Sequence, residues 1–337
     1  MSPPELELHE LLALAGAGRL SSLFGAARDA PALIVHLNDD HVVDTSYALN
    51  ATDIGTLPVV LIGMGASGST NISLVDVLAD RADDLDEIVA AVQRQPLASA
   101  SLALLLRHGD QRSISAGLIA ESTTYSMLQS GPAFLAWRAG RPRRAAAPAD
   151  EVTEAVEVLV ENDADAIRIT LNRPQRHNAV DTALSELLVE ALTQALAEPS
   201  KRVVITGSGP SFCSGGDLDS FGSFSSPVDA HAVRLTRSAA HLIAMMTDRV
   251  EVQLHGACIG AGIELAAFAA TVHAVPDVRI ALPEVSFGLV PGAGGTVSLP
   301  RRIGRHRTAL LALTGRSLDL PTALAWGLVD APTTPTQ

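Results

Sequence analysis

The chain has 337 residues, of which 47% are hydrophobic and 18% charged, and its formal net charge is −13. This composition is typical of a globular protein with a large core and excludes a disordered chain. The negative charge argues against a broad surface for nucleic acid or anionic membranes. No apolar run reaches the ~18 residues that span a bilayer. The acidic N-terminus lacks the basic start of a signal peptide, so we expect a cytoplasmic protein.

Basic residues and cysteines limit the kinds of site that the chain can build. Lys201 is the only lysine among the 24 basic residues. A bound phosphate is therefore expected to be held by arginine, backbone amides or helix ends. The two cysteines, Cys213 and Cys258, form neither a disulfide framework nor a zinc-ligand spacing. We expect no bound metal.

The length suits two units, and the N-terminal one is expected over residues 1–140. It contains apolar segments at 32–39, 59–67 and 102–109, followed by a long amphipathic segment at 116–140 that predicts a helix. The proline- and arginine-rich stretch after it predicts a linker over 141–152.

The second unit, residues 153–337, alternates strand and helix patterns. Strands are predicted at 166–172, 202–207, 250–256 and 278–282, and helices at 179–198, about 230–246 and 263–274. Such alternation predicts an α/β fold with helices packed against sheets.

The two units share a pattern that suggests an internal repeat. Segments 32–39, 59–67 and 102–109 resemble the second unit's strands at 166–172, 203–211 and 250–256. A duplication explains this similarity, and so does the fact that α/β segments commonly share such strand ends. Under the duplication, Ile72, Ser73 and about Ile119 match Gly216, Asp217 and Glu264. We therefore expect the first unit to be non-catalytic.

Three clusters in the second unit carry candidate chemistry. The loop Ser211–Leu218 has adjacent glycines, which let backbone N–H groups approach a ligand. The segment His255–Leu265 leads from a strand into the first turn of a helix, where unpaired N–H groups can stabilise an oxyanion. The segment Pro283–Thr296 places a glutamate before a glycine-rich turn. Glu264 and Glu284 have apolar neighbours, so the two carboxyls can hold different protonation states.

Together these clusters resemble the enoyl-CoA hydratase/isomerase (crotonase) superfamily over roughly residues 155–330. The resemblance rests on ITLNRPQRHNAV (169–180), VVITGSGPSFCSGGDL (203–218), HGACIGAGIEL (255–265), ALPEVSFGLVPGAGGT (281–296) and TGRSLDLPTALAWGLVD (314–330). It implies an α/β spiral of ββα repeats, of the ClpP/crotonase type, that cradles an acyl-CoA thioester. If the two units arose by duplication, the first unit would be a degenerate crotonase-like copy.

The resemblance also implies roles for individual residues. The backbone N–H groups of Gly216 and Ala261 would form an oxyanion hole, although Ala261 stands where the family often has glycine. Glu264 would activate water, and Glu284 would exchange a proton at the α-carbon. The predicted coenzyme A contacts are Arg176, Ala179, Ser214, Gly216, Asp217 and Leu218, and the predicted substrate-pocket residues are Phe221, Pro291 and Gly292.

The implied activity is hydration of a trans-2-enoyl-CoA in fatty-acid-type metabolism, with coenzyme A as part of the substrate and no separate cofactor. Two alternatives stay open: an enoyl-CoA isomerase that needs only Glu284, and a catalytically silent subunit that binds acyl-CoA or a partner enzyme. Family members form trimers or hexamers and usually carry a further helical segment after the motif ending in GLV. Here the sequence stops seven residues past Asp330, so we expect residues 116–140 to take over part of that segment's role.

Three weaker signals favour structural interpretations. Gly63–Gly68 fits the pattern G-x-G-x-x-G, but the matching place in the second unit has no such fingerprint, which argues against dinucleotide binding. Cys213 and Cys258 are expected to be inert packing residues. His108 and His255, each at a predicted strand end before a glycine, are expected to be hydrogen-bonded structural histidines.

Overall fold

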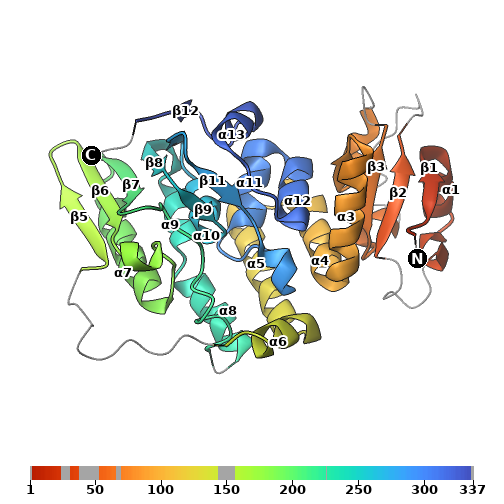
Figure 1. The fold of residues 1–337 in the computed structure, drawn as a ribbon, viewed down its shortest axis with the longest axis horizontal. Helices are drawn as coiled ribbons and strands as arrows, with labels where there is room; N and C mark the ends of the chain where they lie inside the picture. The colour runs from red at the N-terminus through yellow and green to blue at the C-terminus, as the bar shows by residue number, and fades with distance from the viewer. Residues whose placement is uncertain are drawn as a thin grey trace.

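The computed structural model describes residues 2–23, 31–37, 53–65, 70–142, 156–224 and 226–334. A four-stranded sheet lies at one end of the molecule and a six-stranded sheet at the other, with helices between them (Figure 1). The predicted linker 141–152 lies outside the described residues except for its first two positions, and so does Gly68 of the G-x-G-x-x-G pattern.

The N-terminal sheet is parallel throughout. Its strands, in spatial order, are β1 (Glu5–Glu7), β2 (Ala32–His36), β3 (Val60–Met64) and β4 (Val77–Ala79). Apart from His36 at the end of β2, the strands β2 and β3 are apolar throughout, as expected of parallel strands buried on both faces. The helix α1 (Leu8–Gly16) packs its buried leucines on one face. The apolar segments at 32–39 and 59–67, which resemble strands of the second unit, thus form β2 and β3 in their described parts.

Four helices follow this sheet: α3 (Ala82–Arg94), α4 (Pro96–Arg107), α5 (Ile114–Gln129) and α6 (Pro132–Ala139). The expected single helix over 116–140 is therefore two helices. They separate at Gly131, because Pro132 has no N–H to continue the hydrogen-bond ladder and suits a first helical turn. The comparison of 102–109 with a strand is wrong, since residues 102–107 belong to α4 and Gly109 begins a 3-10 turn. The leucines and alanines of α4 favour helix over strand.

The larger sheet has the spatial order β12-β10-β8-β7-β6-β5, and only the pair β5–β6 is antiparallel. A second, two-stranded sheet pairs β9 with β11. The strands predicted at 166–172, 202–207, 250–256 and 278–282 are confirmed, with small differences at their ends. The strands are β5 (Val158–Asn162), β6 (Ala166–Leu171), β7 (Arg202–Gly207), β8 (Val250–Leu254), β9 (Ala257–Ile259), β10 (Thr271–Ala274), β11 (Arg279–Ala281) and β12 (Ala331–Pro332).

Seven α-helices accompany the larger sheet in the described part of the chain. They are α7 (Thr182–Leu196), α8 (Pro227–Thr236), α9 (Ala239–Met245), α10 (Ala261–Ala266), α11 (Gly295–Ile303), α12 (Arg305–Thr314) and α13 (Leu320–Trp326). The predicted helix at 179–198 is confirmed as α7, which Asp181 caps. The prediction over 230–246 covers two helices instead of one. The prediction over 263–274 is wrong beyond Ala266, because Thr271–Ala274 pairs with β8 as strand β10.

One hydrophobic core runs through both halves of the chain. It joins the leucines of α4 and α5 to residues of β6, β8, α10 and α11. The helix α5 packs against α8 and α11, and α6 packs against the 3-10 helix η8 (Glu284–Phe287). In the part of the chain that the structure describes, no single helix combines the length and the apolar character that a membrane crossing requires; α3 and α4 reach them only as a pair bent by 113°.

Candidate active site

The candidate site lies where three turns of the second half meet. The loop after β7 runs beside β9, since Cys213 and Cys258 form a parallel bridge. The same loop pairs with the segment before α7 through a bridge between Val180 and Gly216. The turn from β9 into α10 and the residues from Glu284 onward complete the site. Strand pairing therefore brings together three clusters that are far apart in the sequence.

Gly260 makes the sharp turn between β9 and α10. Its backbone adopts φ 50° and ψ −122°, a conformation that L-residues with a side chain rarely reach. A Cβ atom at this position would overlap Glu284 Oε1. Glycine is therefore needed both for the turn and for the close approach of the Glu284 carboxyl.

Two backbone N–H groups at the site have no acceptor within the described residues. Gly216 N–H donates no hydrogen bond, whereas its neighbour Asp217 N–H donates to Val180 O at 2.8 Å. Ala261 is the first residue of α10, where an N–H has no acceptor inside the helix. Both residues line the same cavity. An oxygen bound between them would receive two donors and the positive end of the helix dipole.

The two predicted glutamates are buried in the same cavity, Glu264 with 2% of its surface exposed and Glu284 with 7%. Glu264 Oε2 accepts hydrogen bonds from Ala293 N at 2.7 Å and Gly295 N at 2.9 Å. Glu284 Oε2 is buried without a hydrogen-bond partner among the described residues. One carboxyl is thus fixed by the backbone, and the other is held mainly by packing.

Burial dominates the protonation of both carboxyls. It raises the pKa of Glu284 to about 7. It also raises the pKa of Glu264 well above its usual value, and the charge of Glu284 adds to this effect. The two amide donors on Glu264 act in the opposite direction, because they stabilise its ionised form. A carboxyl pair of this kind holds a proton near neutral pH that two exposed carboxyls would have lost.

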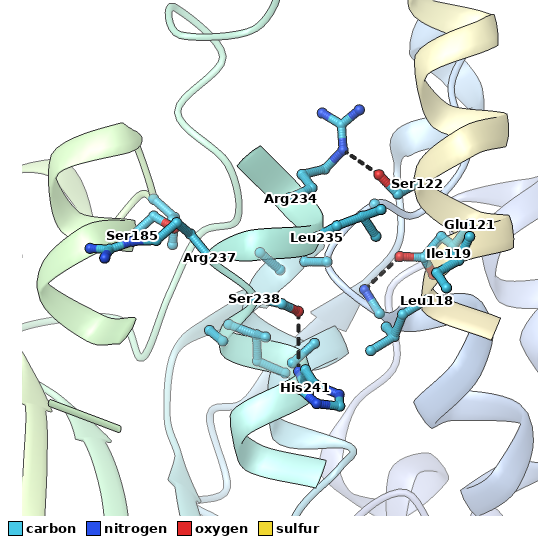
Figure 2. Close-up of a pocket in the computed structure, with 18 of the residues that line it drawn as sticks. Leu118, Ile119, Glu121, Ser122, Ser185, Arg234, Leu235, Arg237, Ser238 and His241 are labelled. Atoms are coloured by element: carbon cyan, nitrogen blue, oxygen red, sulfur yellow. Dashed lines mark hydrogen bonds between the residues drawn. The ribbon is translucent and has the colours of Figure 1, made fainter. Parts of the chain in front are cut away.

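The cavity around these groups, here called the catalytic cavity, measures about 220 Å³. A second cavity of about 300 Å³, the side cavity, lies between α5 on one side and α8 and α9 on the other (Figure 2). The two cavities share lining residues that include Ala261, Gly292 and Arg234. Leu118 and Ile119 of α5 face the side cavity opposite Leu235 of α8. The side cavity thus extends the site between the two halves of the chain.

Residues 161–336, just over half of the chain, match the family model described as enoyl-CoA hydratase/isomerase. The chain belongs to this family. The protein named probable enoyl-CoA hydratase echA8 in Mycobacterium tuberculosis is 32% identical over 51% of this chain and 67% of its own length. The 2,3-dehydroadipyl-CoA hydratase of Escherichia coli is 34% identical over 52% of this chain and 68% of its own length.

Solved structures agree with this assignment. The crystal structure of an enoyl-CoA hydratase from Thermoplasma volcanium has 36% identity and a TM-score of 0.50, covering 53% of this chain and 73% of that protein. The second half of the chain therefore has the predicted α/β crotonase fold, and the first half adds an α/β unit with a parallel sheet. That the first unit is a degenerate crotonase-like copy stays a prediction.

In this member of the enoyl-CoA hydratase/isomerase family, several predicted site residues lie around one cavity. The catalytic cavity is lined by Gly216, Phe221, Ala261, Glu264, Glu284 and Gly292. Pro291 is buried beside this group, and a Cβ atom on Gly295 would lie 2.9 Å from it. The Phe221 ring packs directly on Gly216, where a Cβ atom would overlap it.

Most of the predicted coenzyme A contacts do not line the catalytic cavity. Arg176 forms an ion pair of 2.7 Å with Asp217, whose side chain is buried. Ser214 N donates to His177 O at 2.9 Å, and Ala179 O accepts from Arg173. Leu218 O accepts from Arg138 of α6 at 3.3 Å. Among these residues only Gly216 also lines the catalytic cavity.

A third buried glutamate, Glu121 of α5, was missed by the sequence reasoning. It has 2% of its surface exposed and lines the side cavity. Its Oε1 accepts from Gly294 N at 2.7 Å, and its Oε2 accepts from Thr296 N at 2.8 Å and Thr296 Oγ1 at 2.7 Å. A signal existed, because Glu121 is the only charged residue in α5. A lone carboxylate on an otherwise uncharged helix indicates a buried partner.

Other residues of the first half also lie at the site. Tyr125 of α5 lines the catalytic cavity and packs against Gly292. Trp137 of α6 stacks on Phe287 with ring centroids 4.8 Å apart and tilts against Phe221 at 6.3 Å. Residues 116–140 therefore contact the site, as the sequence led us to expect.

The two cysteines and two histidines that gave weaker signals in the sequence have structural roles. Cys213 and Cys258 are both buried, and burial raises the pKa of each thiol, to about 12 for Cys213. This disfavours the nucleophilic thiolate. His108 Nε2 and His255 Nε2 lie 2.8 Å and 3.0 Å from the carbonyl oxygens of Gly55 and Gly209. The prediction of hydrogen-bonded structural histidines is confirmed.

Proposed function

We propose that this chain hydrates 2-enoyl-CoA thioesters to 3-hydroxyacyl-CoA products. One observation carries the proposal: a single cavity is lined by Glu264, Glu284, Gly216 and Ala261. The backbone N–H groups of Gly216 and Ala261 donate no hydrogen bond within the described residues. Addition of water to an enoyl thioester needs a base for the water, an acid for the α-carbon and donors for the developing enolate oxygen. The cavity supplies each of these groups.

The thioester oxygen accepts hydrogen bonds from Gly216 N–H and Ala261 N–H. Glu264 takes a proton from water while the water oxygen bonds to the β-carbon. The electron pair of the double bond moves toward the thioester oxygen, where the two N–H groups stabilise the negative charge. The α-carbon then takes the proton of Glu284. Transfer of a proton from Glu264 back to Glu284 restores the starting state.

The assignment of the two glutamates follows from their hydrogen bonds. Two amide donors on Glu264 Oε2 favour the ionised form, which leaves Oε1 for the water. Glu284 Oε2 has no donor among the described residues, which favours the protonated form. Because burial raises the pKa of Glu284 to about 7, this residue can still hold a proton near neutral pH.

The remaining predictions extend this proposal to the whole substrate. The acyl group occupies the side cavity, whose walls include Leu118, Leu188 and Leu265. The coenzyme A part lies along the loop that carries Arg176 and Asp217. We also propose the predicted cytoplasmic trimer or hexamer, which a native mass measurement and localisation of the tagged protein would test.

The test is the loss of enoyl-thioester absorbance when the purified protein meets crotonyl-CoA or longer trans-2-enoyl-CoAs. We expect Glu264→Gln and Glu284→Gln each to lower kcat by about 10²–10⁴-fold, the usual contribution of one general acid or base. Glu186→Gln is the matched control, because Glu186 is an exposed carboxylate at the rim of the same cavity. A wild-type protein that leaves all of these thioesters unchanged would contradict hydration.

The free Oε2 of Glu284 also suits an isomerase, which needs one carboxyl to move a proton between the α- and γ-carbons. A 3-enoyl-CoA substrate separates the two functions. Isomerisation that is lost in Glu284→Gln and kept in Glu264→Gln would favour the isomerase. Binding of an acyl-CoA without any turnover would favour the silent subunit.

A further inference from the structure

The turn Ala293–Thr296 donates its successive backbone N–H groups to two different carboxylates. Ala293 N and Gly295 N donate to Glu264, and Gly294 N and Thr296 N donate to Glu121. The turn ends at the start of α11, where a helix offers unpaired N–H groups and a positive dipole end. Glu121 and Glu264 therefore share one set of donors, although they come from opposite halves of the chain.

Glu121 uses both of its carboxyl oxygens in these contacts. Three donors bind it, and the hydroxyl of Thr296 is one of them. It lines the side cavity and not the catalytic cavity. Its arrangement thus differs from that of Glu264, which keeps one oxygen without a hydrogen bond among the described residues. Glu121 is placed to hold the turn in position.

Other titratable or charged groups surround Glu121. Arg234 of α8 lines both cavities, lies over the Tyr125 ring at 4.8 Å and donates to Ser122 and Ser126 of α5. Arg301 of α11 is bound to backbone oxygens of Val297 and Arg112. Among the described residues, Tyr125, Arg234, Glu264 and Glu284 interact electrostatically with Glu121. Arg237 and His241 line the same cavity, and His231 hydrogen-bonds to the neighbouring Ser122.

We propose that Glu121 is a positioning residue for the hydration chemistry: it clamps the Ala293–Thr296 turn onto Glu264, and its negative charge keeps one proton on the pair Glu264–Glu284. Hydration needs one member of this pair ionised and the other protonated. A third carboxylate beside them opposes the loss of the last proton, because two like charges in a buried site repel. The first half of the chain thereby sets the pH range of a reaction carried out by the second half.

The shifted pKa values of the three buried glutamates agree with this positioning role of Glu121. The charge of Glu121 contributes to the raised pKa of both Glu264 and Glu284. Burial raises the pKa of Glu121 itself to about 7, while its three hydrogen bonds and Arg234 oppose this shift. Above neutral pH, Glu121 is therefore ionised and its charge acts on the pair.

This inference rests on the proposed function, and the main experiment is the pH dependence of kcat for hydration in Glu121→Gln. Without the charge of Glu121, the pair loses its last proton at lower pH. We expect the alkaline limb of the profile to move to lower pH by roughly one unit, the size of a Coulomb interaction over a few ångströms at a partly screened site. KM for the thioester is measured alongside, because Glu121 lines the side cavity in which we place the acyl group, and the shift of the alkaline limb of kcat is the readout that reports the charge.

Two further variants separate charge from geometry. Glu121→Asp keeps the charge but is too short to hold the turn, so kcat falls while the alkaline limb stays near its wild-type position. Asp76→Asn controls for lost stability, because Asp76 is equally buried and pairs with Arg107 at 2.7 Å. It should lower the melting temperature without moving the alkaline limb.

If Glu121→Gln does not fold, a less disruptive substitution still tests the effect of the Glu121 charge. Thr296→Val removes one donor from Glu121, which favours its neutral form and should move the alkaline limb in the same direction by less. Thr308→Val is its matched control: Thr308 is also buried, and its hydroxyl donates to Gly304 O at 2.9 Å.

The readouts also distinguish failure of the inference from failure of the proposed function. Infrared difference spectra of the protonated-carboxyl C=O stretch follow the buried protons without any substrate. The midpoint for the loss of these protons should lie at lower pH in Glu121→Gln than in wild type. The inference is wrong if neither the infrared midpoint nor the alkaline limb of kcat shifts in Glu121→Gln and Thr296→Val. Glu121 would then be only a structural helix cap. A wild type without hydratase activity would contradict the proposed function alone, because the spectra still test the carboxyl coupling.

Discussion

At the scale of single residues, Gly260 links the backbone of the proposed oxyanion site to the carboxyl of Glu284, the proposed acid. Its positive φ allows the turn that exposes Ala261 N–H, and its missing side chain makes room for Glu284 Oε1. The sequence indicated that small residues were needed here. It did not indicate that the neighbour would be Glu284, which lies on a separate turn and approaches only because β11 pairs with β9.

We predict that Gly260→Ala lowers both stability and activity. The strained backbone should cost about 1–3 kcal/mol, and the added methyl group displaces the Glu284 carboxyl. Gly304→Ala is the matched control: Gly304 also has a positive φ, of 80°, but a Cβ atom there meets nothing within 4 Å. Urea denaturation and kcat measure the two effects. Equal activity losses in both variants would contradict the steric argument.

Glu284 should also make stability depend on pH. Its pKa is about 7 in the folded protein, against an ordinary value of 4.5. A raised folded-state pKa contributes stability that is fully present below about pH 4.5 and is lost as the pH rises through 7. We predict that the free energy of unfolding of the wild type falls between pH 5 and pH 8 by up to about 3 kcal/mol more than that of Glu284→Gln. Urea titrations at the two pH values measure this, and parallel pH dependence would contradict it.

At the scale of elements, α5 is the part of the first half that lies deepest in the site. It places Glu121, Ser122 and Tyr125 on the face that packs against α8 and α11. Gly117 makes the close approach possible, because a Cβ atom there would lie 2.8 Å from Val297 of α11. The position of Glu121 thus depends on a helix contact that no local pattern reveals.

We predict that Gly117→Leu moves α5 away from α11 and lowers kcat by at least about tenfold, since small displacements of groups around a reacting centre are costly. Overpacking of this kind usually costs about 1–3 kcal/mol. Thr123→Leu adds similar bulk to an exposed position of the same helix and should leave kcat unchanged. Activity retained in Gly117→Leu would show that the site tolerates movement of α5.

At the scale of the whole molecule, the two halves share one hydrophobic core. Leu102, Leu128 and Phe134 belong to the same cluster as Ile263 and Val297. Polar contacts cross the same interface, as when Arg316 of the second half pairs with Asp84 of the first at 3.1 Å. The first half buries one apolar cluster by itself, but the larger core needs both halves, so their association is expected not to depend on the covalent connection between them.

We predict that a protease site placed within residues 145–150 can be cut without separating the two halves. The fragments should remain together on size-exclusion chromatography and keep most of the hydratase activity. A chain that lacks residues 1–140 should instead be insoluble or inactive, because it exposes the faces of α10, α11 and η8. Separation of the cut fragments, or full activity of the truncated chain, would contradict a shared core.

The sequence by itself determined the family, the alternation of strands and helices in the second half, and the local chemistry of both glutamates. These features depend on residue type and short spacing, such as the glycines beside Glu264 and the apolar period of α7. Tertiary structure alone decided where local preference was ambiguous: Thr271–Ala274 became a strand because β8 offered a partner. It also decided that Glu121 reaches the site, because a contact between residues 173 positions apart follows from packing of whole helices and leaves no local pattern.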